Sequence, residues 1–242
     1  TANTDSDGTG NCTTKVSLGT PTAADNCTTA GNFIFIAKVG GITITPATHL
    51  FGLGNTTVVW TATDQAGNVS TSCNQIVTVI DNENPTVTPA ANVVTTTSAD
   101  GTGDCTVSRA IPNATYADNC SVAKLTWVMT GATSGNSSSA GINQVGTQTF
   151  NIGITNITYT VTDASGNPST DSMTVRVTDD EDPFITCPSD QNVFFAANCQ
   201  FTLPDYSSLA SASDNCGTST ITQSPAPGTL ISGTTVVTLT AK

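Results

Sequence analysis

Three observations predict that this chain is all-β and consists of tandem antiparallel β-sandwich modules in an extended rod. The phrase Thr-Ala-Thr-Asp-Gln-Ala-Gly-Asn at 61–68 returns as Thr-Val-Thr-Asp-Ala-Ser-Gly-Asn at 160–167. β-Branched and aromatic residues gather in short runs bounded by Gly, Pro, Asn and Asp, as strands do. No segment shows the 3.6-residue apolar period of a helix. A unit of about 98 residues built this way favours an immunoglobulin-like sandwich over a solenoid, whose repeats are shorter.

The expected strands occupy matching places in the first two copies of the repeat. Leu125, Trp127 and Met129 fall on one face of their strand, so that face is expected to be buried. Trp60 and Trp127 are interpreted as core residues rather than as sugar-binding platforms. The expected strands are 13–18, 33–39, 56–63 and 75–80 in the first copy, and 106–110, 122–130, 154–162 and 173–178 in the second.

Two acidic, proline-bearing phrases mark the expected module boundaries, at 81–85 and 179–183. Proline lacks an N–H donor and biases the preceding residue toward extended conformations, which suits a short, stiff linker. We expect a first module at 1–82 without its first strand, a complete second module at 83–181, and a third at 182–242 without its last strand. The segment is therefore interpreted as a window from a longer repeat array.

The charge balance excludes several classes of partner. The chain has 6 Lys and Arg against 18 Asp and Glu, for a net charge of −12. Such a surface repels nucleic acid and anionic membranes, because phosphate binding needs cationic side chains. No run approaches the 18 apolar residues of a membrane span. We therefore expect no nucleic-acid partner and no membrane insertion.

The eight cysteines indicate an oxidising compartment and disulfides rather than a zinc site. No Cys-x-x-Cys pair is present, and His49 is the single histidine. Each copy of the repeat carries two cysteines 15 to 17 residues apart, which we interpret as a bond within each module. Closing such a loop should contribute roughly 3 kcal/mol by the chain-entropy model. The predicted pairs are Cys12–Cys27, Cys105–Cys120 and Cys199–Cys216.

Two further cysteines are expected to bond outside this segment. The second copy has Ser172 and Thr88 where the first and third have Cys73 and Cys187. Because the second copy lacks the cysteine at both positions, the cysteines at these two positions are expected to pair with each other inside a single module. Cys73 would then bond to a residue before position 1 and Cys187 to one after position 242. A Cys73–Cys187 bond is the alternative.

Acidic residues near the boundaries are candidate calcium ligands, because calcium takes six to eight oxygens and a junction between modules gathers them. The phrase at 81–85 resembles the calcium-binding linker of cadherins. The alternative is that these Asp and Asn residues form the Asx-turns of their loops and that the linker acids are solvated. The candidate ligands are Asp64, Asn68, Asp81, Glu83, Asp163, Asn167, Asp179, Asp180, Glu181 and Asp182.

Three other patterns are weighed against simpler interpretations. In Asp-Asn-Cys, the acids Asp25, Asp118 and Asp214 are expected to cap a turn that positions the cysteine, rather than to bind a cation. Ser172, in Asp-Ser-Met, is a candidate O-glycosylation site, and several Asn-x-Ser/Thr triplets are also present. Neither His49 nor any carboxylate pair forms a recognisable catalytic pattern, so no enzymatic activity is predicted.

The order of motifs resembles the hyalin repeat (HYR) family. Thr-Cys-Pro at 186–188, Asp-Asn-Cys at 214–216, Gly-Thr-Thr-Val at 233–236, the Asp-x-x-Gly-Asn turn ending at Asn68 and the phrase at 81–85 follow the family's sequence of marks. The second copy departs from it by lacking Thr-Cys-Pro and the late cysteine, and by a Ser/Gly-rich insert at 131–141. The resemblance implies an extracellular immunoglobulin-like fold without enzymatic activity, used in adhesion. The Thr-rich, Lys-poor style also resembles the long surface adhesins of gliding Bacteroidota.

The predicted function is that of a non-enzymatic, adhesive stalk on a cell surface or in a filament, stiffened by linkers and disulfides. Its expected partners are neighbouring modules of the same chain, with surface polysaccharide or cell-surface molecules as candidates, and calcium is the one candidate cofactor. Two alternatives remain open: an accessory binding module of a secreted enzyme, and a carbohydrate or protein receptor built on the sandwich loops.

Overall fold

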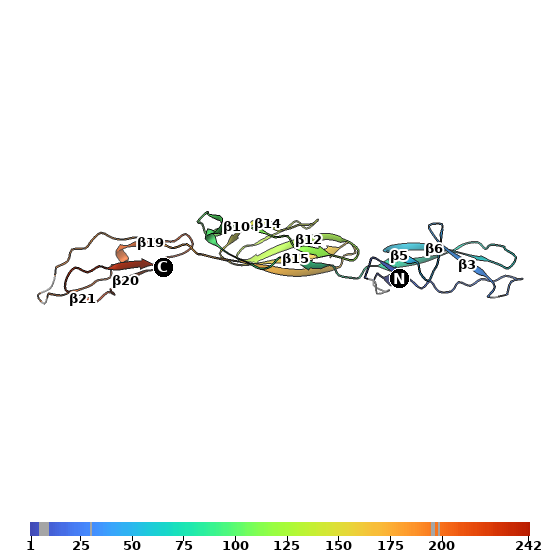
Figure 1. The fold of residues 1–242 in the computed structure, drawn as a ribbon, viewed down its shortest axis with the longest axis horizontal. Helices are drawn as coiled ribbons and strands as arrows, with labels where there is room; N and C mark the ends of the chain where they lie inside the picture. Colours follow the sequence, from blue (N-terminus) through green and yellow to red (C-terminus); the bar gives the residue numbers. More distant parts are fainter. Residues whose placement is uncertain (5–9, 30, 195–196, 198) are drawn as a thin grey trace.

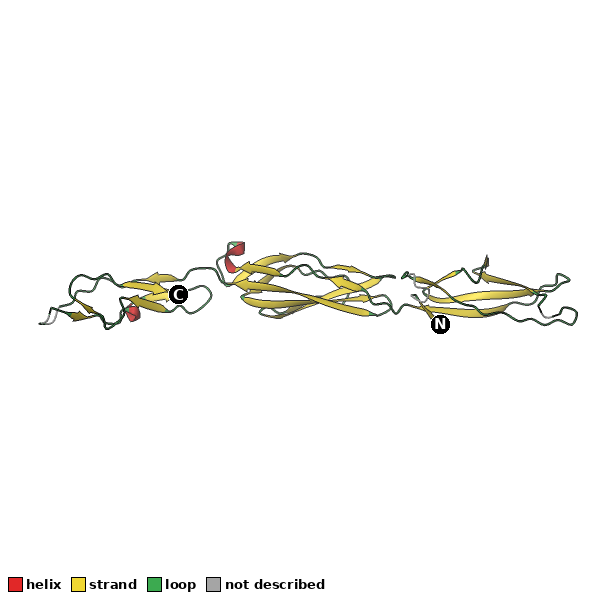
Figure 2. Cartoon of the chain, turned by 60° about the horizontal axis from the view of Figure 1, so that its bottom comes forward, coloured by secondary structure: helices red, strands yellow, loops and turns green. Residues whose placement is uncertain are grey.

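The computed structural model describes residues 1–4, 10–29, 31–194, 197 and 199–242. Nearly all of its regular structure is β-strand, with two short 3-10 helices. The strands fall into three groups that lie end to end along one long axis (Figures 1 and 2). The all-β, rod-like fold class is therefore confirmed.

The second module is a sandwich with one five-stranded sheet. That sheet has the order β13-β12-β15-β16-β9, and the pairs β10–β14 and β11–β8 cover it. The edge strand β9 runs parallel to β16, whereas the other pairs are antiparallel. The strands are β8 (Thr86–Thr88), β9 (Val93–Thr96), β10 (Thr106–Ile111), β11 (Thr115–Ala117), β12 (Val122–Gly131), β13 (Gly135–Asn136), β14 (Gly146–Asn151), β15 (Gly153–Asp163) and β16 (Pro168–Thr178), with the 3-10 helix η1 at Thr97–Asp100.

The core of this module follows the alternation of its strands. Leu125, Trp127 and Met129 are buried on β12, as their shared face predicted. Tyr159 and Val161 on β15 are fully buried against them in the same cluster. Burying such side chains stabilises a sandwich by roughly 1.5–3 kcal/mol each.

The first module repeats this plan with a smaller core. Its five-stranded sheet has the order β1-β7-β6-β3-β4, with the pair β2–β5 beside it. Phe51, Val58 and Trp60 are buried there, and the Trp60 indole N–H donates to Gln75 Oε1 at 2.9 Å. The strands are β1 (Ala2–Asn3), β2 (Thr13–Lys15), β3 (Ile34–Val39), β4 (Ile42–Ile44), β5 (Leu50–Gly52), β6 (Gly54–Thr63) and β7 (Cys73–Ile80).

The third module is the least packed of the three. Of its described residues, Leu203 is the one hydrophobic side chain that is buried, and Phe194 is 94% exposed. A hollow of about 550 Å³ opens between 187–193 and 231–239. Its elements are β17 (Phe184–Thr186), β18 (Phe201–Thr202), the 3-10 helix η2 (Ser207–Leu209), β19 (Ser211–Ser213), β20 (Ile221–Ser224), β21 (Leu230–Ile231) and β22 (Thr238–Ala241), in three two-stranded sheets.

The Ser/Gly-rich insert at 131–141 has a structural place that its composition does not suggest. Its β13 adds an edge strand to β12, and Ser137 Oγ accepts a hydrogen bond from the Trp127 backbone N–H at 3.0 Å. Gly131 is required where β12 ends, because its φ is +99° and a Cβ would lie 2.3 Å from the Ile154 carbonyl oxygen.

Candidate junction sites between the modules

Each linker passes through a polar cluster built from two modules. We call the cluster around 81–85 the first junction and the cluster around 179–183 the second junction. In both, a parallel edge strand (β1 or β9) brings a threonine beside the linker from the preceding module. In both, a loop of the following module brings Asp-Asn-Cys, before β12 at the first junction and before β20 at the second.

A buried threonine organises the acids at each junction. Thr4 is 0% exposed, and its hydroxyl oxygen lies 3.3 Å from carboxylate oxygens of both Asp81 and Glu83. Thr97 is likewise 0% exposed, with its hydroxyl 3.3 Å from Asp179 and 2.7 Å from Glu181. The same residue types at the same places in the repeat therefore make the same contacts twice.

The Asp-Asn-Cys acids cap turns, as predicted. In each copy the aspartate carboxylate accepts a hydrogen bond from the cysteine N–H two residues later, at 3.0 Å for Asp25, 2.9 Å for Asp118 and 2.7 Å for Asp214. In the second and third copies, the asparagine between the aspartate and the cysteine reaches the preceding module. Asn119 Nδ2 lies 3.5 Å from Thr4 Oγ1, and Asn215 Nδ2 donates to Glu181 at 2.7 Å. This motif fixes both the cysteine and the contact across the junction.

The first junction is closed by a disulfide between modules. Cys12, which precedes β2 of the first module, is bonded to Cys120 of the second, with the Cα atoms 4.7 Å apart. The bond joins residues 108 apart in the sequence. The two modules are therefore joined covalently twice, by the linker and by this disulfide.

This bond corrects the cysteine pairing expected from the spacing. The predicted pairs Cys12–Cys27 and Cys105–Cys120 are wrong, because Cys12 and Cys120 are bonded to each other, and Cys199–Cys216 is absent, since both thiols are free. The physical reason lies in the segment between the cysteines of one module. Residues 106–111 and 115–117 are extended strands, so Cys105 and Cys120 lie toward opposite ends of the module.

The second junction brings the loops of two free cysteines together. The Cys105 thiol donates a hydrogen bond to the backbone carbonyl of Asn215, the residue before Cys216. Desolvation, the side chain of Cys105 and the negative charge of Asp179 raise the pKa of the Cys216 thiol to about 12.

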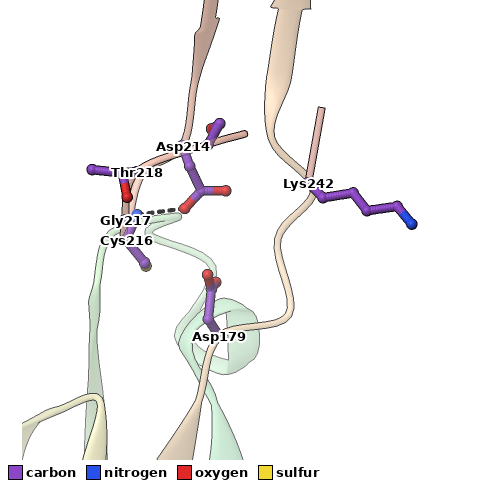
Figure 3. A pocket seen from close by; sticks show the side chains of 7 residues that line it. Asp179, Asp214, Cys216, Gly217, Thr218 and Lys242 are labelled. Carbon is purple, nitrogen blue, oxygen red and sulfur yellow. Dashed lines mark hydrogen bonds between the residues drawn. The ribbon is translucent and has the colours of Figure 1, made fainter. Parts of the chain in front are cut away.

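Figure 3 shows the hollow beside these thiols, about 200 Å³ in volume. The carboxylates of Asp214 and Asp179 lie one above the other beside the Cys216 side chain, and the Lys242 ammonium points away. One ligand atom from each of Asp179, Asp214 and Cys216 falls within 4.8 Å of the others, as do those of Asp81, Asp118 and Cys120 at the first junction. Calcium prefers oxygen to sulfur, so in each set the carboxylates alone suit it.

The candidate calcium ligands in the Asp-x-x-Gly-Asn turns are largely occupied by the turns themselves. Asn68 donates to Asp64 through its backbone at 2.7 Å and its side chain at 2.8 Å. These bonds, the side-chain one first, hold the pKa of Asp64 below its usual range. Asp163, 2% exposed, accepts equivalent bonds from Asn167. The Asx-turn interpretation accounts for these contacts.

The second of these turns nevertheless reaches the first junction. Asn167 Nδ2 donates to the Asp81 carbonyl oxygen at 3.3 Å, and Ser165 Oγ donates to its carboxylate at 3.4 Å. Asp81 is thereby 7% exposed. Asp64 and Asn68 lie in the equivalent turn of the first module, which no described contact joins to a junction.

The remaining predicted site residues are placed as follows. The hydroxyl of Ser98 donates to Asp180 at 2.7 Å, and this bond is the first cause that lowers the pKa of Asp180. Asp182 is exposed in the linker, and Ser172 is exposed on β16. Cys73 and Cys187 are exposed and free, in the outer two modules, so the alternative Cys73–Cys187 bond is not formed. Calcium binding, glycosylation and bonds of these two cysteines beyond the segment stay predictions.

The sequence of the chain is similar to that of known proteins. No family model matches the chain. It is 32% identical over 233 residues to hyalin of Lytechinus variegatus, across 91% of this chain and 38% of that protein. It is 34% identical over 158 residues to hyalin of Strongylocentrotus purpuratus, across 65% of this chain and 11% of that protein. The chain resembles hyalin.

These matches support a hyalin-repeat-like chain, as the motif order predicted. The chain spans less than two fifths of the Lytechinus hyalin and about a tenth of the Strongylocentrotus one. Solved structures aligned with it include human CDH23 EC21-23, at TM-score 0.36, 13% identity, and 90% and 88% coverage of the two chains. The fibronectin(III)-like modules of Clostridium thermocellum CbhA align at TM-score 0.28 and 18% identity, over 60% of this chain and 77% of that one. Similarity at this level adds nothing to the fold described above.

Proposed function

We propose that this chain is a non-enzymatic, adhesive segment of an extracellular repeat protein, and that it acts as a stiff stalk. The observation that carries the proposal is the junction itself. A linker flanked by buried polar contacts and a disulfide between modules resists bending at the one place where an array of sandwiches is otherwise free to bend. Inter-module contacts of this kind are needed for a fixed angle, because module interfaces within a chain usually allow motion.

Other features support an extracellular location. The similarity to hyalin, the disulfide and the six further cysteines suit an oxidising compartment. Among the residues that the structure describes, no helix is long and apolar enough to cross a membrane. We keep a gliding-motility adhesin of Bacteroidota as the proposed kind of parent protein on the style of the sequence alone.

The stalk proposal is tested by solution scattering. The protein studied carries serine in place of the exposed cysteines Cys27, Cys73, Cys187 and Cys199, so that chains do not crosslink; we call it the four-serine protein. We expect its oxidised form to have the maximum dimension of a straight rod and a narrow distance distribution. Reduction should broaden that distribution while circular dichroism stays unchanged. Equal scattering before and after reduction would contradict a disulfide-stiffened stalk.

We also propose that calcium strengthens the first junction. The observation that favours it is a pair of buried oxygens, Asp118 Oδ1 and Asn119 Oδ1, without a described hydrogen-bond partner. They belong to a cluster that also contains the carboxylates of Asp81 and Glu83. Buried unpartnered oxygens beside uncompensated carboxylates are costly, and a divalent cation would satisfy them.

Thermal unfolding with calcium and with chelator tests this second proposal. Calcium is expected to raise the melting temperature of the four-serine protein, and Asp118→Asn is expected to reduce that rise. Asp171→Asn, at an exposed residue of β16 that belongs to neither acidic cluster, is the matched control and should leave that rise unchanged. If chelator and calcium give identical melting curves, the junction acids do not bind calcium.

A further inference from the structure

We propose that Cys105 and Cys216 form a second disulfide between modules, equivalent to Cys12–Cys120, so that both junctions of this segment are crosslinked by the same rule. Under this rule the cysteine of the Gly-(Asn/Asp)-Cys phrase in one module bonds to the Asp-Asn-Cys cysteine of the next. The bond deepens the proposed stalk function, and only its purpose rests on that function.

The repeat places Cys105 and Cys216 where the bonded pair lies. Gly10-Asn11-Cys12 follows Thr4 as Gly103-Asp104-Cys105 follows Thr97, with eight residues from threonine to cysteine in both. The separation is 108 residues for the bonded pair and 111 for this one. Since the threonines, linker acids and Asp-Asn-Cys turns of the two junctions make equivalent contacts, the cysteines are carried to equivalent positions.

The contacts at the second junction bring the loops of the two cysteines together. The Cys105 thiol donates a hydrogen bond to the carbonyl of Asn215, the residue before Cys216. Asn215 Nδ2 also donates to the Gly103 carbonyl oxygen at 3.3 Å, two residues before Cys105. Two hydrogen bonds therefore hold the two cysteine loops against each other, and the described contacts bring no other cysteine to either thiol.

The chemistry is a thiol–disulfide exchange. A small-molecule disulfide supplies the oxidant: one Cys thiolate attacks it and releases the first small thiol, and the second Cys thiolate then displaces the other. One S–S bond forms in the protein and one breaks in the reagent, and the two protons and two electrons lost by the cysteines end on two small-molecule thiols. The thiolate is the attacking species.

The tryptic map of this chain distinguishes every pairing. Cleavage after Lys15, Arg109, Lys124 and the other basic residues places Cys12, Cys105, Cys120 and Cys216 on four different peptides. The four-serine protein is incubated with oxidised glutathione, alkylated, digested without reduction and analysed by mass spectrometry. We expect two crosslinked peptide pairs, 12 with 120 and 105 with 216, and no alkylated cysteine.

Single replacements provide the controls. Cys105→Ser should leave Cys216 alone alkylated, and Cys12→Ser should leave Cys120 alone alkylated, with circular dichroism confirming that each variant folds. Alkylation of both Cys105 and Cys216 in the oxidised parent, beside an intact Cys12–Cys120 bond, would overturn the proposal. So would a crosslink of Cys105 to Cys120.

Scattering of the same samples separates this bond from the stalk function. The double variant Cys105→Ser/Cys216→Ser should broaden the distance distribution of the oxidised protein if the bond stiffens the second junction. If the 105–216 crosslink is mapped but the double variant does not broaden the distance distribution, the bond is confirmed and its role in stiffness is rejected. If the crosslink is not found but scattering still shows a rigid rod, the bond is rejected and the stalk proposal stands.

Discussion

The first and second junctions are built from the same residues but differ in how far they are closed. At the first, Asp81 is 7% exposed under Ser165 and Asn167 of the following module, and the cysteines are bonded. At the second, Asp179 is exposed, no equivalent turn covers it among the described residues, and the two cysteines are free.

This comparison separates the polar contacts that both junctions share from the covering turn and the disulfide, which, among the described residues, only the first junction has. The threonine, the linker acids and the Asp-Asn-Cys turn form at both junctions, so this polar frame needs neither the covering turn nor the bond. Burial of the linker acid accompanies the covering turn of the next module. The same polar contacts accompany a bonded cysteine pair at the first junction and two free cysteines at the second.

The largest expected effect comes from removing the sulfur atoms at either junction. In the chain-entropy model, a loop of the size closed by Cys12–Cys120 contributes about 4–5 kcal/mol. Cys12→Ser/Cys120→Ser should lower the free energy of unfolding of the oxidised four-serine protein by up to about that amount. Cys105→Ser/Cys216→Ser should match it, as read by guanidinium unfolding. Reductant should erase the differences; a difference that persists in reductant would assign the effect to packing instead.

The next effect tests the Asp-Asn-Cys turn. Asp118→Ala and Asp214→Ala remove a charged acceptor of backbone N–H groups, which is worth about 1–2 kcal/mol where it is partly buried. Both should also slow closure of their own disulfide, followed by quenched alkylation and mass spectrometry. Asp25→Ala is the matched control, because Asp25 makes the same turn without a junction beside it. The rates of closure of both junction disulfides in Asp25→Ala serve as the reference. If Asp118→Ala and Asp214→Ala close their own disulfides as fast as this reference does, the turn does not position the cysteine.

A smaller effect is expected from the buried threonines. Thr4→Val and Thr97→Val each remove a hydroxyl donor to the linker acids and should cost about 1 kcal/mol in chemical unfolding. Thr97→Val should cost more, since its bond to Glu181 is 2.7 Å long. Thr95→Val is the control: this residue is buried on β9, and no hydroxyl partner is described for it. A control as costly as Thr97→Val would mean that the hydroxyl contacts contribute little.

The smallest effect concerns the reduced second junction. Because the pKa of Cys216 is raised to about 12, its thiol is protonated at pH 8 and should react slowly with iodoacetamide. Asp179→Asn removes a negative charge that raises this pKa, so the pKa should fall and the rate at pH 8 should increase several-fold. The rate of both proteins should rise with pH as the thiolate forms. Identical rate–pH profiles would show that Asp179 does not act on the thiol.

The fold was predictable because its signals are local. Turn residues and β-branched runs placed β3, β6, β12 and β15 to within a few residues, and the alternation on β12 identified its buried face. The Asp-Asn-Cys cap was also predictable, since the hydrogen bond spans two residues. The strand β13 was missed because it pairs through backbone groups, which the Ser/Gly composition of the insert does not reveal.

The cysteine pairing was not predictable from spacing alone. In a repeat, a constant interval between two cysteines fits a bond within each module and a bond between consecutive modules equally well. A signal was present, however. The expected strand at 106–110 alone covers about 15 Å at 3.3 Å per residue, whereas bonded cysteines need Cα atoms within about 7 Å. An extended run between two cysteines argues against joining them.

That extended run has a mechanical meaning. With both bonds closed, the shortest covalent route from Cys12 to Cys216 crosses the second module along residues 105–120 only, entering and leaving through sulfur. Fifteen peptide steps reach at most about 50 Å, and much of this length is already drawn out in β10 and β11. Tension along such an array would be carried by residues 105–120. The strands β12, β15 and β16 lie outside this covalent route and would bear little of the force. Pulled from its ends, the rod would reach its full length without unravelling its modules, as a chain of rigid links does.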